Sequence, residues 1–329
     1  MIDRILEDIK PRRKVLILTH NNPDPDTIAA ATGLRFILSE RLKKRCTVAF
    51  HGIVGRAENR ELLRMCKIEM HSSMKLNFAR YDYLIVVDTQ PKAGNVYIPE
   101  GFKADVVIDH HNYRNSTAEI RINDVRPDAG STSTIITEYM KHLSIIPDTD
   151  TATALYYGIK TDTVGSGRTS TCTDKAMMSY IFPYISHKKL TKIENPEVPR
   201  YYFKNLKKAV ECSEIIDNLI FCDLGEVRNA DLIAETSDFL LRMRDIKWTF
   251  VVGRIDNAGY FSLRSKSIRT AVGRMAISLV KGLGTGGGHM KSAGGQLNLT
   301  DRDYQEVISI IKERLLKKIG ITNAEIKKI

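Results

Sequence analysis

Short and almost continuous apolar runs recur through the first 165 residues, and they restrict the fold more than any other feature. These runs are Lys14–Thr19, Val48–Phe50, Tyr83–Val87 and Ala104–Ile108. A strand that is apolar along its whole length is buried on both faces, as in the interior of a parallel sheet. Because helical patterns at 27–42 and 131–143 lie between the runs, the chain is predicted to form a doubly wound α/β domain.

A change of pattern near residue 185 predicts a boundary between two domains. Pro196, Pro199 and many lysines interrupt the alternation across residues 185–210, and a helix is expected at 203–218. Beyond it the chain alternates between strand-like and helical patterns, at 219–223, 230–242, 248–254, 260–265 and 270–281. We therefore expect an N-terminal domain at 1–185, a linker helix region at 186–215 and a smaller α/β domain at 216–329.

The composition excludes several classes of protein. The five cysteines have no C-x-x-C spacing, so a common zinc or redox site is not expected, and we predict reduced, mostly buried thiols in a cytoplasmic protein. Neither a signal peptide nor a membrane span is recognisable, and no membrane partner is expected. The net charge of +11 favours polyanionic partners, although a lysine-rich surface without a partner explains it equally well.

Acids and histidines gather where the apolar runs end. In chain order they are His20, Asp24, Asp26, Asp88, Asp109, His110, His111 and, after a further apolar segment, Asp162. In an open α/β sheet, the carboxyl ends of the strands line one crevice. We therefore expect these side chains to converge, although they are distant in sequence.

Carboxylates packed this closely repel one another unless a cation lies among them. Two divalent ions that share one carboxylate would relieve the repulsion. The mixture of imidazole and carboxylate suits Mn²⁺, and Mg²⁺ with less preference for histidine. Each residue also has an ordinary interpretation, because Asp24 or Asp26 alone commonly caps a helix and Asp88 alone can end a strand in a turn. Their combination favours a metal site.

Four of these segments resemble the motifs of the DHH phosphoesterase superfamily: HNNPDPD, VVDTQ, DHH and the segment around Asp162. FSLRSKS followed by GTGGGHMKSAGG is similar to the DHH-associated domain with its GGGH motif. The family includes RecJ-type exonucleases, oligoribonucleases that also act on phosphoadenosine phosphate, cyclic-dinucleotide phosphodiesterases and manganese pyrophosphatases. Since the pyrophosphatase branch carries a different second domain, the resemblance is to the nucleotide branch, and in particular to nanoRNase-type oligoribonucleases related to RecJ.

The resemblance implies a role for each matching residue of the first domain. One ion would be held by His20, Asp24 and Asp88, and the other by Asp26, Asp88, His110 and Asp162. The implied catalytic residues are Asp88, which bridges the ions, His110, and His111, which faces the substrate phosphate. Asp109 would orient His110 or its strand.

Glycines and an arginine predict phosphate contacts in the second domain. Gly287 and Gly288 allow backbone N–H groups to approach an anion closely, and His289 can donate to a phosphate oxygen. Arg264, beside Ser265, is a fork-shaped donor suited to phosphate. The ordinary interpretations are a surface salt bridge for Arg264 and a structural glycine loop.

The sequence thus predicts a two-metal phosphodiesterase or phosphatase that uses activated water on short RNA or DNA oligonucleotides or on nucleotide phosphates. Three alternatives stay open. They are a RecJ-like exonuclease on single-stranded nucleic acid, a cyclic-dinucleotide phosphodiesterase, and a non-catalytic nucleotide-binding protein. A homodimer is also left open, and no residue stands out as the general acid.

Overall fold

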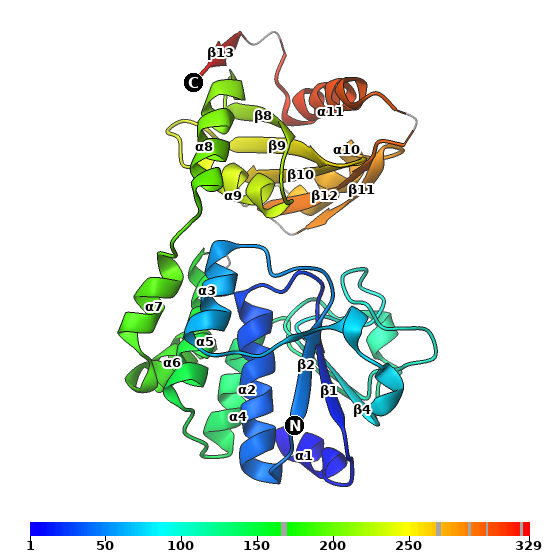
Figure 1. Cartoon of the computed structure of the whole chain (residues 1–329), viewed down its shortest axis with the longest axis vertical. Coiled ribbons are helices and arrows are strands. Elements are labelled where there is room, and N and C mark those ends of the chain that lie inside the picture. The colour runs from blue at the N-terminus through cyan, green and yellow to red at the C-terminus, as the bar shows by residue number, and fades with distance from the viewer. Residues whose placement is uncertain (166–169, 268–270, 289–290, 301, 323–324) are drawn as a thin grey trace. The chain divides into compact units, whose positions relative to one another are not determined.

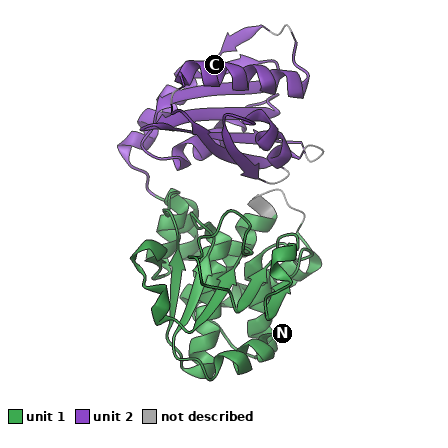
Figure 2. Cartoon of the chain, turned by 90° about the vertical axis from the view of Figure 1, so that its right-hand side faces the viewer, with its two compact units in different colours: residues 1–196 green, residues 197–329 purple. Residues whose placement is uncertain are grey.

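The computed structural model describes residues 1–165, 170–267, 271–288, 291–300, 302–322 and 325–329. The chain forms two compact units, residues 1–196 and residues 197–329, which Figure 2 shows in different colours. Each unit has its own sheet and its own hydrophobic core.

Unit 1 contains a six-stranded sheet in which all neighbouring strands run parallel (Figure 1). Its strands are β1 Val15–Thr19, β2 Cys46–Phe50, β3 His71–Ser72, β4 Tyr83–Val87, β5 Val106–Asp109 and β6 Ile122–Val125. Their order in the sheet is β3-β2-β1-β4-β5-β6. The chain builds outward from β1 to β3 and then returns to build from β4 to β6. A topological switch point therefore lies between β1 and β4, where ligands bind in folds of this kind.

The α-helices of unit 1 lie mainly on one side of this sheet, where α2 and α4 contact the strands. They are α1 Ile2–Ile9, α2 Pro25–Leu42, α3 Ala57–Met65, α4 Thr132–His142, α5 Thr149–Lys160, α6 Cys172–Ile181 and α7 His187–Glu194. On this side Ile17 and Ile85 enter the core. On the other face Leu16 and Leu84 pack with Phe78, which lies in the 3₁₀ turn Phe78–Arg80. The central strands are buried on both faces, as their apolar runs predict.

The doubly wound α/β fold is confirmed, and the two helices predicted at 27–42 and 131–143 correspond to α2 and α4. The edge strands β3 and β6 were not predicted. β3 has only two residues, and β6 has the sequence INDV. Neither strand contains the continuous apolar run that marks a central strand.

Unit 2 contains a seven-stranded mixed sheet in the order β11-β12-β10-β9-β8-β7-β13, in which only β8 and β9 pair in parallel among the described strands. Its elements are α8 Arg200–Cys212, β7 Glu214–Ile216, β8 Leu219–Glu226, α9 Asp231–Leu240, β9 Trp248–Ile255, β10 Ala258–Ser265, α10 Val272–Leu279, β11 Gly284–Gly288, β12 Ser292–Asn298, α11 Tyr304–Ile319 and β13 Ile326–Lys328. Helices α10 and α11 cover one face, and α8 and α9 cover the other.

Two details of the second half differ from the sequence prediction. The helix predicted at 203–218 corresponds to α8, but α8 ends at Cys212 because the following residues pair with β8 as strand β7. The glycine stretch contains a strand, β11, which pairs with β12. Helix α10 lies so close to this strand that a side chain on Gly273 would collide with the Gly288 carbonyl. Close packing therefore explains part of the glycine content.

All five cysteines are free, and their burial varies. Cys66 and Cys222 are buried, Cys46 and Cys212 are half-buried, and Cys172 is exposed. Across the residues that the structure describes, none of the helices has both the length and the apolar character needed to cross a membrane.

Gly158 lies in α5 where this helix packs against α2 and α4. A Cβ added at Gly158 would lie 2.5 Å from Ser133 Oγ and 2.9 Å from Ala29 Cβ. Helix propensity alone favours alanine by about 1 kcal/mol, but relieving such an overlap costs about 1–3 kcal/mol. We therefore expect Gly158→Ala to lower the midpoint of urea unfolding measured by circular dichroism. A higher midpoint would contradict the close packing of these helices.

Candidate metal centre

The parallel sheet of unit 1 brings acidic and histidine side chains together at the switch point. His20 follows β1, Asp88 follows β4, and Asp109 ends β5 with His110 after it. The segment 24–26 begins α2, the helix that follows β1. Because β4 pairs with both β1 and β5, the ends of these strands lie side by side.

Asp162 reaches the same place by a different route. The sequence pattern placed it after an apolar segment, like a residue at a strand end. In the structure it lies in a π-helical turn, Thr161–Gly165, which continues α5. Such turns are rare in helices and are frequent at functional sites.

The predicted residues form three overlapping groups, within each of which the candidate ligand atoms lie within 4.8 Å of one another. The groups are His20 with Asp24 and Asp88, Asp26 with His110 and Asp162, and Asp88 with His110 and His111. The Asp88 carboxylate joins them, because Oδ2 is 3.6 Å from His20 Nε2 and Oδ1 is 3.4 Å from His110 Nε2. The structure thus brings all seven residues together, while their role as ligands stays a prediction.

The spacing of the donor atoms fits shared cations. His20 Nε2 is 3.6 Å from Asp24 Oδ1, and His110 Nε2 is 3.6 Å from Asp162 Oδ2. Hydrogen bonds between nitrogen and oxygen are shorter, at about 2.7–3.2 Å. Two ligands bound at about 2.1 Å to one ion lie roughly 3.0–3.4 Å apart at octahedral or tetrahedral angles. The imidazole and carboxylate donors therefore need only small adjustments to hold divalent ions.

The turn after β4 holds Asp88 in an uncommon conformation. Its φ angle is +61°, in the left-handed region that aspartate tolerates better than most residues. The Asp88 N–H donates to the Ile108 carbonyl at 2.9 Å, and the Thr132 hydroxyl donates to Asp88 Oδ1 at 2.8 Å. Strained backbone of this kind persists where the surroundings over-determine it, and it clusters at functional sites.

The N-terminus of α4 holds the buried Asp26 carboxylate. The backbone N–H groups of Thr132 and Ser133 donate to its two oxygens at 2.7 and 2.8 Å. Helix N-termini favour negative charge. Even so, burial and the neighbouring carboxylates of Asp88 and Asp24 raise the pKa of Asp26 well above its usual range. The site concentrates more negative charge than its own donors neutralise, and a divalent cation relieves this condition.

His20 and Asp24 each stabilise the charged form of the other. Burial alone would lower the pKa of His20, but Asp24 and Asp88 outweigh it and raise the pKa well above the usual range. Burial opposes ionisation of Asp24 too, yet His20 lowers its pKa. Asp24 also accepts the Thr27 N–H at 3.0 Å as the cap of α2. The ordinary role as a helix cap therefore coexists with membership of the site.

Asp109 positions its two histidine neighbours in different ways. Its Oδ1 accepts hydrogen bonds from His111 Nδ1 at 2.8 Å and from the His110 backbone N–H at 2.9 Å. Gln90 Nε2 donates to Oδ2 at 2.7 Å. Burial opposes ionisation, but His111 and Gln90 lower the pKa of Asp109. The ring that Asp109 orients is thus that of His111, while it holds His110 through the backbone.

Sequence reasoning missed the residues that support this site. Thr132 and Ser133 hold Asp88 and Asp26, and Gln90 holds Asp109. One signal was the run GSTST at the start of a predicted helix, which is rich in small donors. A second was Gln90 itself, which belongs to the VVDTQ segment.

Two residues of unit 2 that were predicted to contact phosphate make hydrogen bonds within the protein instead. Arg264 Nε lies 2.6 Å from Asp238 Oδ1, and Nη1 donates to the carbonyls of Leu263 and Ala293. These are the contacts of the ordinary interpretation, a salt bridge. Ser265 is only 2% exposed, and its hydroxyl accepts the Ser267 N–H.

The glycine motif is only partly described by the structure. Gly287 and Gly288 belong to β11, and space is open where a Gly287 side chain would be. His289 lies outside the described residues. The anion-binding role of this segment stays a prediction.

Known proteins resemble the chain over most of its length. The DHH family, N-terminal domain, matches residues 14–159. The uncharacterized protein MJ1633 of Methanocaldococcus jannaschii is 34% identical over 97% of this chain and 67% of that protein. The cyclic-di-AMP phosphodiesterase GdpP of Geobacillus thermodenitrificans is 29% identical over 87% of this chain and 45% of GdpP. The chain therefore spans less than half the length of GdpP.

Two solved structures show the same fold at low sequence identity. An exopolyphosphatase-related protein from Bacteroides fragilis has a TM-score of 0.76 and 17% identity, over 97% of this chain and 96% of that chain. RecJ from Thermus thermophilus, in complex with Mn²⁺, has a TM-score of 0.50 and 12% identity, over 99% of this chain and 55% of that chain.

The position of Asp88 between the groups predicts how mutation changes metal content. Asp88→Asn is expected to lose both ions, because its oxygens face different groups. Asp24→Asn is expected to keep one ion, since Asp24 belongs to the His20 group alone. Asp150→Asn is the control, because Asp150 pairs with Lys189 outside the site. Mn²⁺ per chain is measured by atomic emission after desalting. Two ions bound to Asp88→Asn would rule out the bridging role.

Proposed function

The chain belongs to the DHH family, and from this premise we propose that it is a two-metal phosphoesterase acting on short oligonucleotides or nucleotide phosphates. The observation that carries this proposal is the setting of Asp88. Its carboxylate is 2% exposed, and each oxygen faces a different group of donors. A single-metal site has no need of a carboxylate placed in this way.

The residues of the site would have three roles in catalysis: metal ligand, phosphate donor and support for the ligands. Bound divalent ions supply Lewis-acid activation of water and neutralise charge on the phosphate. They would be held by His20, Asp24 and Asp88, and by Asp26, Asp88, His110 and Asp162. His111 has its Nδ1 hydrogen-bonded to Asp109, so the Nε2–H of the protonated ring would be the donor to a phosphate oxygen. The hydroxyl of Thr132 and the N-terminus of α4 keep Asp88 and Asp26 in place.

Short nucleic acids are the substrate class that we favour. The motif resemblance to nanoRNase-type oligoribonucleases and the net charge of +11 support this choice, because a basic protein attracts polyanions. The similarity to the cyclic-di-AMP phosphodiesterase GdpP supports a second candidate, the hydrolysis of cyclic dinucleotides. Both activities need the same metal centre and differ only in how the remainder of the substrate is recognised.

Hydrolysis is expected to require a divalent metal and to be faster with Mn²⁺ than with Mg²⁺, because His20 and His110 are among the expected ligands together with the carboxylates. The measurement is release of p-nitrophenol from bis-p-nitrophenyl phosphate, before and after dialysis against EDTA. Readdition of Mn²⁺ to the dialysed protein is the control for irreversible damage. Full activity in the presence of excess chelator would exclude the two-metal proposal.

Substrate length is expected to separate the candidate activities. We expect dinucleotides to pentanucleotides to be cut faster than strands of about 20 nucleotides at about 0.15 M salt, and the preference to persist as salt rises. Chromatography of the products from each length, and from cyclic di-AMP, gives the rates. A rate that climbs with length and collapses at high salt would identify a strand-tracking exonuclease. Absence of turnover on every substrate with Mn²⁺ bound would identify a binding protein.

A further inference from the structure

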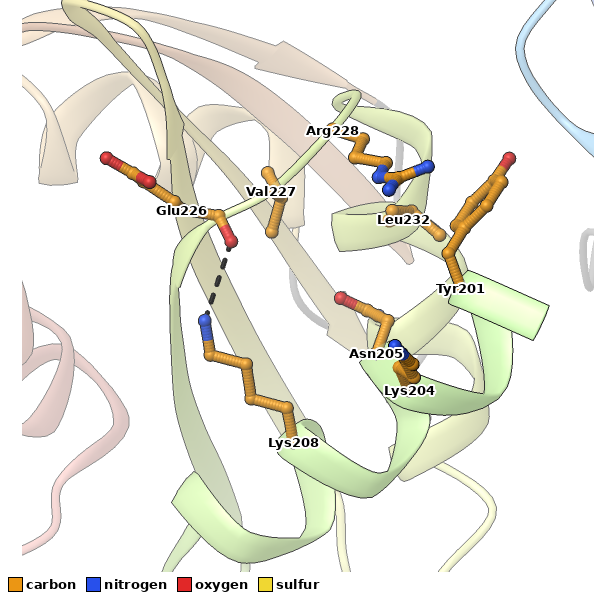
Figure 3. Close-up of a pocket in the computed structure, with 8 residues that line it drawn as sticks. All are labelled: Tyr201, Lys204, Asn205, Lys208, Glu226, Val227, Arg228 and Leu232. Atoms are coloured by element: carbon orange, nitrogen blue, oxygen red, sulfur yellow. Dashed lines mark hydrogen bonds between the residues drawn. The ribbon is translucent and has the colours of Figure 1, made fainter. Parts of the chain in front are cut away.

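Unit 2 carries a pocket between α8 and the segment that follows β8 (Figure 3). Its volume is about 340 Å³, which lies within the range of small-molecule sites, roughly 300–1,000 Å³. Helix α8 contributes Tyr201, Lys204, Asn205 and Lys208. Residues at these spacings share one face of a helix. All the lining residues belong to unit 2, and none of them belongs to the metal centre.

The pocket is positively charged. Lys204 and Lys208 are one helical turn apart, and Arg228 comes from the segment on the opposite side. The one acid of the lining is Glu226, whose Oε1 is 3.1 Å from Nη2 of Arg254. It is the backbone carbonyl of Glu226, at 3.5 Å, that faces the Lys208 ammonium in Figure 3. The pocket therefore favours an anion such as a phosphate group.

The other features of the pocket suit a planar ring. The Arg228 guanidinium lies over the Tyr201 ring, 4.9 Å from its centroid. Val227 and the buried Leu232 add apolar surface. Asn205 Nδ2 donates to Thr236 Oγ1 at 2.9 Å, which fixes the amide, and its oxygen points toward the side where Val227 lies in Figure 3. An aromatic face, an apolar wall and a fixed acceptor are the features that recognise a nucleobase with an exocyclic amino group.

We propose that this pocket binds a nucleoside phosphate, with the phosphate at Lys204 and Lys208 and the base among Tyr201, Arg228 and Leu232. The same chemistry is present in a free mononucleotide and in the phosphorylated end of an oligonucleotide. Binding needs no metal ion, because lysine and arginine side chains, not a metal held by carboxylates, neutralise the phosphate. The site therefore stands independently of the proposed hydrolysis.

The test is calorimetric titration of the full chain, kept free of metal with EDTA so that nothing is hydrolysed. The ligands are AMP, adenosine, inorganic phosphate and a pentanucleotide with a 5′-phosphate. We expect AMP to bind, and the double variant Lys204→Ala/Lys208→Ala to weaken its binding at least tenfold, as the loss of charged hydrogen bonds does. The control is Lys207→Ala, which removes one lysine charge from α8 outside the pocket, where Lys207 pairs with Glu211 at 3.6 Å.

The outcomes divide clearly. The proposal is overturned if AMP binds with a Kd above about 1 mM. It is also overturned if Lys207→Ala weakens AMP binding as much as the double variant does, or if inorganic phosphate or adenosine binds as tightly as AMP. Tighter binding of the pentanucleotide assigns the pocket to a strand end, and tighter binding of AMP assigns it to a free nucleotide. Circular dichroism melts establish that the variants are folded. A protein that binds AMP but hydrolyses nothing would separate this proposal from the hydrolytic one.

Discussion

Mutual repulsion of buried carboxylates at the carboxyl ends of β1, β4 and β5 is the constraint on which the site depends. Asp26 and Asp88 are almost completely buried, and the Asp88 carboxylate raises the cost of ionising Asp26. The chain opposes this cost with the N–H groups of α4 and the Thr132 hydroxyl, but the pKa of Asp26 still stands well above its usual range. Donors from the protein are thus insufficient. The remaining imbalance is what makes a cation the natural occupant of the site.

The fold explains why this crowding occurs at one edge of the sheet. Strand order reverses between β1 and β4, so the connections that leave these strands diverge and open a crevice at their carboxyl ends. Helix α2 leaves from the end of β1 and carries Asp24 and Asp26 in its first turn. Helices α4 and α5 pack against α2, and they bring the donors of residues 132–133 and the turn with Asp162. A rigid core thus positions the site, which is not left to long loops.

Much of this site could be predicted from the sequence, for a physical reason. His20, Asp88 and Asp109 come at or directly after runs buried on both faces, and parallel strands end at a common edge. Asp162 could be assigned to the site but not to its π-helical turn, because the apolar segment before it does not distinguish a strand from a helix. The contacts of Thr132 and Ser133 with Asp26 span more than 100 residues. Such tertiary contacts leave no periodicity in the sequence, so local patterns could not predict them.

The positive charges of unit 2 differ in whether they are used within the fold or line a surface that can bind a ligand. As a sum, +11 does not distinguish a general attraction for polyanions from a surface that is merely soluble. In unit 2, Arg264 is occupied by Asp238 and two carbonyls, so its charge is committed to the fold. Lys204, Lys208 and Arg228 instead line one concave surface with an aromatic ring beside them. Specific recognition of a nucleotide needs charge, a stacking face and an acceptor at the same place, and it is this coincidence, more than the net charge, that makes α8 a recognition element.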